Sequence, residues 1–196
     1  MVRLVKILTK SAADTIRLGE TLGRVLRPGD AVAMTGPLGS GKSVLARGIM
    51  AGLGVGSKMP SPSFVIVATY EGACTINHID LYRLDAAEDA IALGIEDLLY
   101  SSSINIIEWA EKAADVLPES RLDVALGLRA RPEERLVTIV PGCEEIGRRL
   151  LPLVQEGLVR EGLVQEGLSG LGGLGGSGSS DAAGQGAGEA SQGGER

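Results

Sequence analysis

Residues 36–43 read Gly-Pro-Leu-Gly-Ser-Gly-Lys-Ser, and this stretch decides which fold the rest of the chain is expected to adopt. It matches G-x-x-x-x-G-K-[ST], the phosphate-binding loop or P-loop, at every defined position. The apolar run 30–35 before it predicts a buried strand, and residues 44–53 after it predict a helix. A strand, a glycine-rich loop and a helix in this order are the context that separates a phosphate site from a chance match.

The residues of this loop have separate expected roles in holding a nucleoside triphosphate. Glycines let the backbone turn tightly and approach a phosphate, while successive N–H groups and the positive end of the helix attract it. Lys42 is expected to reach the β- and γ-phosphates, and the Ser43 hydroxyl to ligate Mg²⁺. The predicted nucleotide-binding residues of the loop are Gly36, Leu38, Gly39, Ser40, Gly41, Lys42, Ser43 and Val44.

Length and charge limit the classes of function. A chain of 196 residues has room for one ordinary domain, and we place it at residues 1–151. The segment 152–196 is rich in glycine, repeats Leu-Val-x-Glu-Gly, and is predicted to be disordered. It carries a net charge of −4 of the total −6, so the domain is only mildly acidic. Without a basic stripe, charge-driven binding of nucleic acid by the chain alone is not expected.

The pattern along the chain predicts a three-layer α/β domain with a mixed sheet of about seven strands. Ser11 and Asp14 have the Ser-x-x-acid form of a helix start. In such folds the ligand lies at the carboxyl ends of the parallel strands. The expected strands are 3–9, 30–35, 65–70, 73–80, 103–107, 121–129 and 134–140, and the expected helices are 12–26, 44–53, 86–99 with an interruption near Gly94, 110–116 and 143–151.

Three further stretches carry candidate chemistry, each with a simpler alternative. Ser63, in Ser-Pro-Ser 61–63, has the place of a switch segment, but an ordinary proline turn explains it as well. Asp80 ends a predicted strand and could orient water or hold the metal shell, or it could cap the next element. Glu108 follows a very apolar strand, where a charge needs a cation or donor. Trp109 beside it either packs on the nucleotide or closes the core. His78, the single histidine, is expected to pack or to orient a neighbour.

These stretches together resemble the bacterial TsaE (YjeE) family, the ATPases of tRNA threonylcarbamoyladenosine synthesis. The resemblance rests on G-x-L-G-x-G-K-S, S-P-S-F, H-I-D-L-Y-R-L and E-W-A-E in this order, and it covers roughly residues 3–140. It implies ATP and Mg²⁺ as cofactors and the TsaB–TsaD pair as partner, with tRNA reached only through that complex. Lys42, Asp80 and Glu108 would be catalytic, Ser43 and Glu108 would hold the metal, and Ser63 and Trp109 would lie at the nucleotide.

The chain departs from the family pattern at three positions. Pro37 stands where the family usually has an aspartate, which removes a carboxylate and a backbone donor from the loop. Ser43 and Ser63 each replace a usual threonine and keep a hydroxyl, so we expect little loss there.

Two other classes of function share the P-loop. A small-molecule kinase could use Arg47 or Arg83 to hold a transferred phosphoryl group, although an arginine-rich lid is not evident. A GTP-operated switch would need an N-K-x-D motif, which the sequence lacks. The N-terminus lacks the apolar core of a signal peptide, and no run approaches the roughly 18 apolar residues of a membrane span. We therefore expect a cytoplasmic protein without membrane contact.

Overall fold

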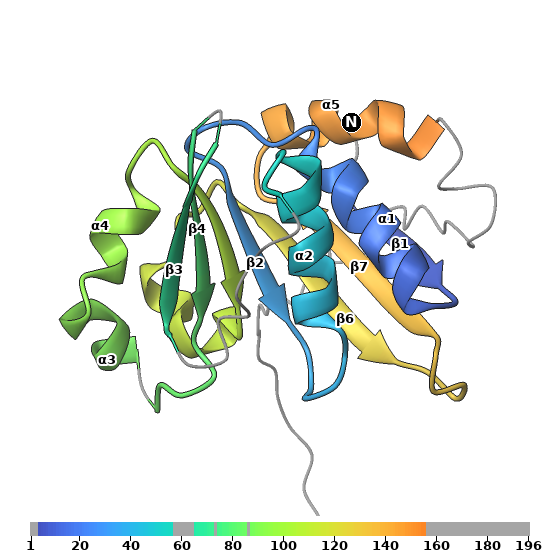
Figure 1. Cartoon of the computed structure of the whole chain (residues 1–196), viewed down its shortest axis with the longest axis horizontal. Coiled ribbons are helices and arrows are strands. Elements are labelled where there is room, and N and C mark those ends of the chain that lie inside the picture. The colour runs from blue at the N-terminus through green and yellow to red at the C-terminus, as the bar shows by residue number, and fades with distance from the viewer. Residues whose placement is uncertain (1–3, 57–64, 73, 86, 156–196) are drawn as a thin grey trace, which may run out of the picture.

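The parallel strands around residues 31–35 form the centre of one mixed sheet in the computed structural model, which describes residues 4–56, 65–72, 74–85 and 87–155 (Figure 1). The sheet has seven strands in the order β1-β7-β6-β2-β5-β4-β3. Strands β6, β2, β5 and β4 pair in parallel, whereas β1, β7 and β3 are antiparallel to their neighbours. The predicted mixed α/β sheet is confirmed. The strands are β1 Val5–Thr9, β2 Ala31–Thr35, β3 Val67–Glu71, β4 Thr75–Asp80, β5 Ile104–Glu108, β6 Leu122–Leu128 and β7 Arg135–Pro141.

Helices cover both faces of the sheet, which gives three layers. The helices are α1 Ala12–Gly23, α2 Lys42–Gly52, α3 Ala87–Ala92, α4 Ile95–Leu99, the 3₁₀-helix η1 Ala110–Val116 and α5 Glu144–Gln155. One apolar core joins α1, α2 and α5 to the sheet, and a second core on the other face joins α3, α4 and η1. Neighbouring residues of β2 alternate between these cores: Val32 and Met34 lie in the first, Ala31 and Ala33 in the second. This two-sided burial explains why the central strands read as continuous apolar runs.

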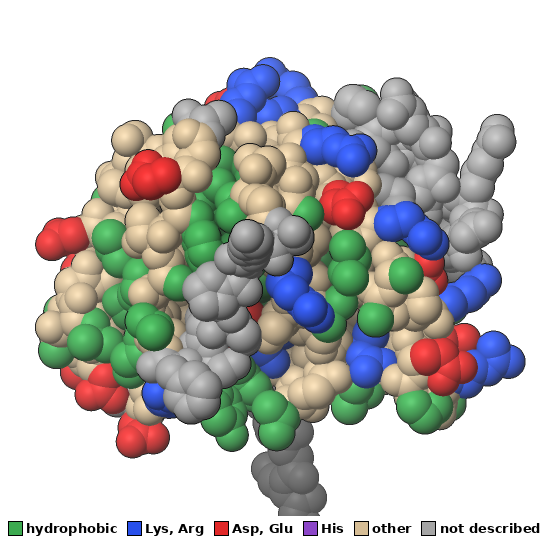
Figure 2. Space-filling view, in the orientation of Figure 1, with side chains coloured by type: hydrophobic (Ala, Val, Ile, Leu, Met, Phe, Trp, Pro, Cys, Tyr) green, Lys and Arg blue, Asp and Glu red, His purple; other side chains and the backbone are tan. Residues whose placement is uncertain are grey.

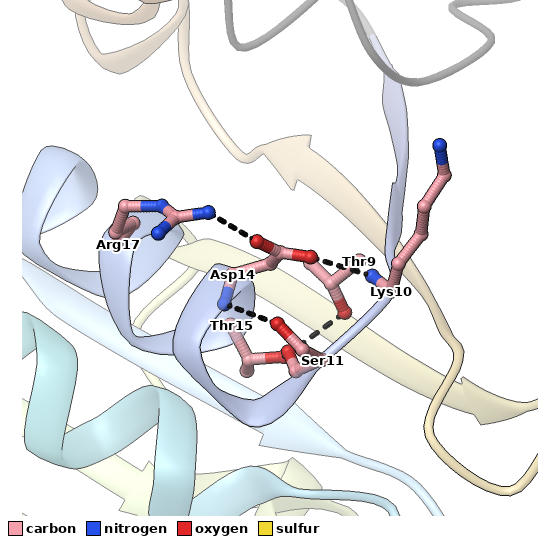
Figure 3. A network of polar contacts seen from close by, with 6 residues as sticks. All are labelled: Thr9, Lys10, Ser11, Asp14, Thr15 and Arg17. Atoms are coloured by element: carbon pink, nitrogen blue, oxygen red, sulfur yellow. Dashed lines mark hydrogen bonds and ion pairs between the residues drawn. The ribbon is translucent and has the colours of Figure 1, made fainter.

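Helix α1 begins as the Ser-x-x-acid pattern predicts. Ser11 is the N-cap, and its Oγ accepts a hydrogen bond of 3.1 Å from the backbone N–H of Asp14 (Figure 3). The Asp14 carboxylate reaches back to the N–H of Lys10 at 3.0 Å and also pairs with Arg17. Beneath them, the hydroxyls of Thr9 and Thr15 are 2.9 Å apart and hydrogen-bonded. These bonds satisfy N–H groups at the junction of β1 and α1.

Four glycines allow α1 to lie directly against α2, the helix that follows the P-loop. A Cβ built on Gly48 would be 2.3 Å from the backbone oxygen of Ile16, and one on Gly19 would be 2.5 Å from that of Leu45. The same holds for Gly23 and Gly52, whose added Cβ atoms would also meet backbone oxygen. A backbone atom cannot move aside as a flexible side chain can. The close approach of α1 and α2 therefore requires glycine at these four positions.

Substitution of Gly48 by alanine is therefore expected to destabilise the protein by about 1–3 kcal/mol, because the methyl group would force the two helices apart. Thermal unfolding followed by circular dichroism measures the change. Gly56→Ala is a matched control, because a Cβ there meets nothing within 4 Å. We expect it to stay within about 0.5 kcal/mol of wild type. Equal melting temperatures for both variants would contradict the close packing of α1 on α2.

Helix α5 is fixed to the start of the central strand by an ion pair. The Arg149 guanidinium donates to both carboxylate oxygens of Asp30, at 2.6 and 2.9 Å, and to the carbonyl of Val25 at 2.9 Å. The hydrogen bonds to Asp30 raise the pKa of Arg149. Both side chains are only 13% exposed, so this bidentate contact is better shielded from water than a surface ion pair.

Several element boundaries differ from those expected. Helix α1 ends at Gly23 rather than near 26, and the chain leaves it through hydrogen bonds from Val25 to Leu22 and from Leu26 to Gly23. The short helix expected at 110–116 has these bounds in the structure and is a 3₁₀-helix. The interruption near Gly94 is confirmed, since Gly94 has φ 66° between α3 and α4.

Helix α5 continues to Gln155, four residues past the expected end of the domain at 151. The predicted disorder concerns 152–196, of which 156–196 lie outside the described residues. Among the helices within the described ranges, none combines the length and the hydrophobicity that a bilayer-spanning helix needs.

Candidate nucleotide site

The P-loop connects β2 to α2 at the carboxyl edge of the parallel strands, as expected (Figure 1). Gly36, Gly39 and Gly41 have φ values of 138°, 77° and 98°, which other L-residues rarely adopt. A Cβ on Gly36 would also lie 2.4 Å from the backbone oxygen of Leu126 on β6. Ser40 N–H donates to the Pro37 carbonyl at 3.1 Å, so the proline is accommodated within the turn. The loop is thus a tight glycine-dependent turn that ends at a helix N-terminus.

Lys42 lies folded against the loop. Its Nζ donates to the carbonyls of Gly36 at 2.7 Å and Pro37 at 3.2 Å, and it lies 3.6 Å from the centre of the Trp109 ring. Burial lowers the pKa of Lys42 below its ordinary value of 10.5, while the charges of Glu108, Glu111 and Asp80 act in the opposite direction. The ammonium group is therefore held among carbonyls, a ring face and negative charges.

Ser43 and Glu108, both predicted metal ligands, are in direct contact. Ser43 Oγ, at the start of α2, donates to Glu108 Oε2 at 2.7 Å. Glu108 ends β5, where it pairs with Met34 of β2 and Asp80 of β4. The carboxylate is only 2% exposed, and its second oxygen is 2.8 Å from Nε2 of His78. Residues from three parts of the chain thus form the chain of contacts Ser43–Glu108–His78.

The hydrogen bonds of His78 indicate its tautomer. Nδ1 is buried and has no hydrogen-bond partner, so a hydrogen on it would be a donor without an acceptor. Placing the single hydrogen on Nε2 lets the ring donate to Oε1 of Glu108. His78 therefore orients the carboxylate, as one of the two roles expected for it.

Trp109 is the only non-glycine with positive φ among the described residues, at φ 59°. Its ring lies 5.0 Å from that of Tyr82, tilted by 44°. The Lys112 ammonium holds the Tyr82 segment by donating to the carbonyls of Tyr82 and Leu84. Backbone strain of this kind concentrates at functional sites, because it persists only where neighbouring contacts enforce it. Here the enforced conformation keeps the indole over Lys42 at the mouth of the P-loop.

Asp80 has a different environment from Glu108, although the two residues are paired in register. Its Oδ1 accepts a hydrogen bond of 3.0 Å from the N–H of Tyr82, so the carboxylate caps the turn after β4. This contact corresponds to the alternative in which Asp80 caps the element that follows its strand. Asp80 still belongs to the electrostatics of the site, because its charge raises the pKa of Lys42.

The remaining predicted site residues differ in placement. Ser63 lies outside the described residues. Val44 is in the first turn of α2. The Leu38 side chain is 72% exposed. Sequence reasoning missed Arg135, which contacts the loop from β7, because no motif marks a residue so distant in the chain.

The donor atoms present fit a magnesium ion. Ser43 Oγ and Glu108 Oε2 are neighbouring hard oxygen ligands, which Mg²⁺ prefers. Across the described ranges, no group of three or more His, Cys, Asp and Glu side chains is arranged to hold a metal. Mg²⁺ is usually bound through one or two carboxylates, with phosphate oxygens and water completing its coordination shell.

A mixed sheet with a P-loop between β2 and α2 defines a P-loop NTPase-like α/β domain. The chain belongs to the TsaE family: the family model for threonylcarbamoyl adenosine biosynthesis protein TsaE matches residues 9–136. The resemblance inferred from the four motifs is thereby confirmed.

Individual relatives agree with this assignment. The tRNA threonylcarbamoyladenosine biosynthesis protein TsaE of Treponema pallidum is 36% identical over 126 residues, covering 64% of this chain and 93% of the relative. The protein of the same name from Bacillus subtilis is 30% identical over 149 residues, covering 71% and 92%. A crystal structure of Bacillus subtilis YdiB superposes with a TM-score of 0.64 at 26% identity, covering 82% of this chain and 97% of that one.

Proposed function

We propose that the chain is a Mg²⁺-dependent ATP hydrolase of tRNA threonylcarbamoyladenosine biosynthesis that acts with the TsaB–TsaD pair. Its relatives carry the name of that pathway. The observation that supports hydrolysis is the 2.7 Å contact between Ser43 on the P-loop helix and the buried Glu108. Such a pair of oxygen ligands at a P-loop is what a metal-bound triphosphate requires. A protein that acts with a tRNA-modifying complex would function in the cytoplasm, and we propose this location for the chain.

The charge balance of the site supports a requirement for a divalent cation. Glu108, Asp80 and Glu111 all act on Lys42, the one lysine at the loop. A triphosphate adds several negative charges next to these carboxylates, and one ammonium group cannot offset them. When bound, Mg²⁺ would polarise the γ-phosphate and neutralise charge as the bond to it breaks.

The residues of the chain have distinct parts in this proposal. Lys42 exchanges its contacts with the Gly36 and Pro37 carbonyls for phosphate oxygens. His78 keeps the Glu108 carboxylate oriented toward Ser43. Asp80, at the end of the adjacent strand, would be the second carboxylate available to orient water, and Trp109 would cover the nucleotide. The loop N–H groups stabilise the charge that develops on the phosphoryl group.

Phosphate release from ATP tests this function, measured with the purified chain alone and with purified TsaB–TsaD. We expect slow release by the chain alone and a higher rate with the pair. Product analysis in the same reactions separates hydrolysis from the kinase alternative, which would yield a phosphorylated metabolite. Competition by GTP tests nucleotide choice. Rapid turnover without a partner, or no response to the pair, would contradict the proposal.

A further inference from the structure

Arg135 connects the P-loop to a part of the chain far from any of the motifs. It is the first residue of β7 and pairs with Thr9 and Leu128 on the flanking strands. Its Nε donates to the Ser40 carbonyl at 3.0 Å, and Nη2 donates to the Gly39 carbonyl at 3.1 Å. The turn between β6 and β7 and the P-loop lie at the same edge of the domain (Figure 1).

The guanidinium is itself held in place. Nη1 donates to the carbonyl of Glu134 at 2.8 Å and to that of Pro132, both in its own turn. A planar guanidinium offers five donors in a fixed fork, so Nη1 holds the β6–β7 turn while the edge formed by Nε and Nη2 holds the loop. Four backbone carbonyls thus converge on one cation.

The planarity of the peptide bond transmits this contact to the phosphate side. In a trans peptide the carbonyl of one residue and the N–H of the next point in opposite directions. Holding the Ser40 carbonyl therefore turns the N–H of Gly41 away from Arg135, at the N-cap of α2. Holding the Gly39 carbonyl likewise fixes the N–H of Ser40, which closes the loop by donating to Pro37.

We propose that Arg135 is a positioning residue that presets the P-loop amides for phosphate binding. It acts through the backbone of Gly39 and Ser40 and does not touch the nucleotide. A cation on the carbonyl side also polarises each amide and makes its N–H a stronger donor. The inference rests on the proposed function, since it deepens how the loop binds ATP.

The test compares Arg135→Met with Arg131→Met in the full-length chain. Arg131 belongs to the same turn, and its replacement by methionine removes the same charge. Its side chain is exposed and pairs with Glu134. Calorimetric titration with ATP and Mg²⁺ should show about tenfold weaker binding for Arg135→Met, since two charge-assisted hydrogen bonds preset the site. Arg131→Met should stay within about twofold of wild type.

Arg135→Lys separates the effect of hydrogen-bond geometry from that of charge, because lysine keeps the positive charge but lacks the planar set of guanidinium donors. We expect it to bind ATP nearly as weakly as Arg135→Met. Full affinity in Arg135→Lys, or equal losses in Arg135→Met and Arg131→Met, would overturn the proposal in favour of a general charge effect.

Hydrogen exchange in the nucleotide-free protein gives a readout independent of ATP. The amides of residues 39–42 should exchange about tenfold faster in Arg135→Met than in Arg131→Met, with the core amides unchanged. Unchanged exchange of the loop would refute the role of Arg135. If wild type binds no ATP, the proposed function fails, while loop exchange still decides the role of Arg135. Should Arg135→Met not fold, Arg135→Lys undergoes the same two measurements.

Discussion

Replacement of Glu108 by glutamine should lower phosphate release from ATP by about two to three orders of magnitude, the range seen when a group that stabilises transition-state charge is lost. Glutamine keeps the size of the side chain and can still contact Ser43 and His78. It lacks the negative charge that a magnesium ion needs from the protein. The measurement is steady-state phosphate release with saturating ATP and Mg²⁺ in the presence of TsaB–TsaD.

Glu111→Gln is the matched control for this prediction. Glu111 is exposed on η1, and its charge also acts on Lys42, but it has no contact with Ser43. We expect its rate to remain within about twofold of wild type. A comparable loss in both variants would mean that the general negative charge of the site matters, and an active Glu108→Gln would remove Glu108 from the chemistry.

Replacement of Lys42 by methionine should weaken ATP binding by about 100-fold, which corresponds to about 2.8 kcal/mol of charge-assisted contact with phosphate. Lys42 is only 4% exposed, and methionine is close to lysine in length, so it fills the same buried space. Because the ammonium binds phosphate directly, the loss should be equally large in Mg²⁺ and in EDTA. Calorimetry under both conditions measures it. Arg47→Met, an exposed charge on the same helix, should bind as wild type does.

The pH dependence of binding identifies Lys42 by a second route. Binding requires the charged amine, and charge is lost as pH rises through the pKa of the free protein. Burial lowers the pKa of Lys42 below 10.5, so ATP affinity should begin to fall at a lower pH than for an ordinary lysine. Among the charges that raise the pKa of Lys42, that of Glu108 has the largest effect. Glu108→Gln removes it and should move the decline in ATP affinity to still lower pH. A pH profile that is unchanged in Lys42→Met would assign the decline to another group.

The fold was largely predictable from the sequence because its signals are local. The apolar run before Gly36, the glycines of the loop and the capping pattern at Ser11 each fix a short segment through backbone chemistry. The strands expected at 73–80 and 103–107 also placed Asp80 and Glu108 at strand ends, where the structure aligns them. Element boundaries were less accurate, because contacts between distant segments, such as Arg149 of α5 with the Val25 carbonyl just after α1, leave no local signal in the sequence.

The contacts that complete the site could be predicted only in part. His78 and Glu108 are 30 residues apart, and their 2.8 Å contact follows from strand order, which the sequence does not state. His78 and Asp80 both belong to β4, yet His78 contacts Glu108 whereas Asp80 accepts a hydrogen bond from the Tyr82 N–H. Arg135 approaches the loop from a strand two positions away in the sheet. On the face shown in Figure 2, Lys and Arg side chains are interspersed with Asp and Glu.

The most direct test of the proposed site is the affinity of the wild-type chain for ATP, titrated once with Mg²⁺ and once with EDTA. If Ser43 and Glu108 hold the metal beside the phosphates, wild type should bind ATP at least about tenfold more tightly with Mg²⁺, since each factor of ten needs only 1.4 kcal/mol. The same pair of titrations on Glu108→Gln should then show nearly equal affinities. Equal affinities in wild type, or an undiminished effect of Mg²⁺ in Glu108→Gln, would contradict a metal site at Ser43 and Glu108.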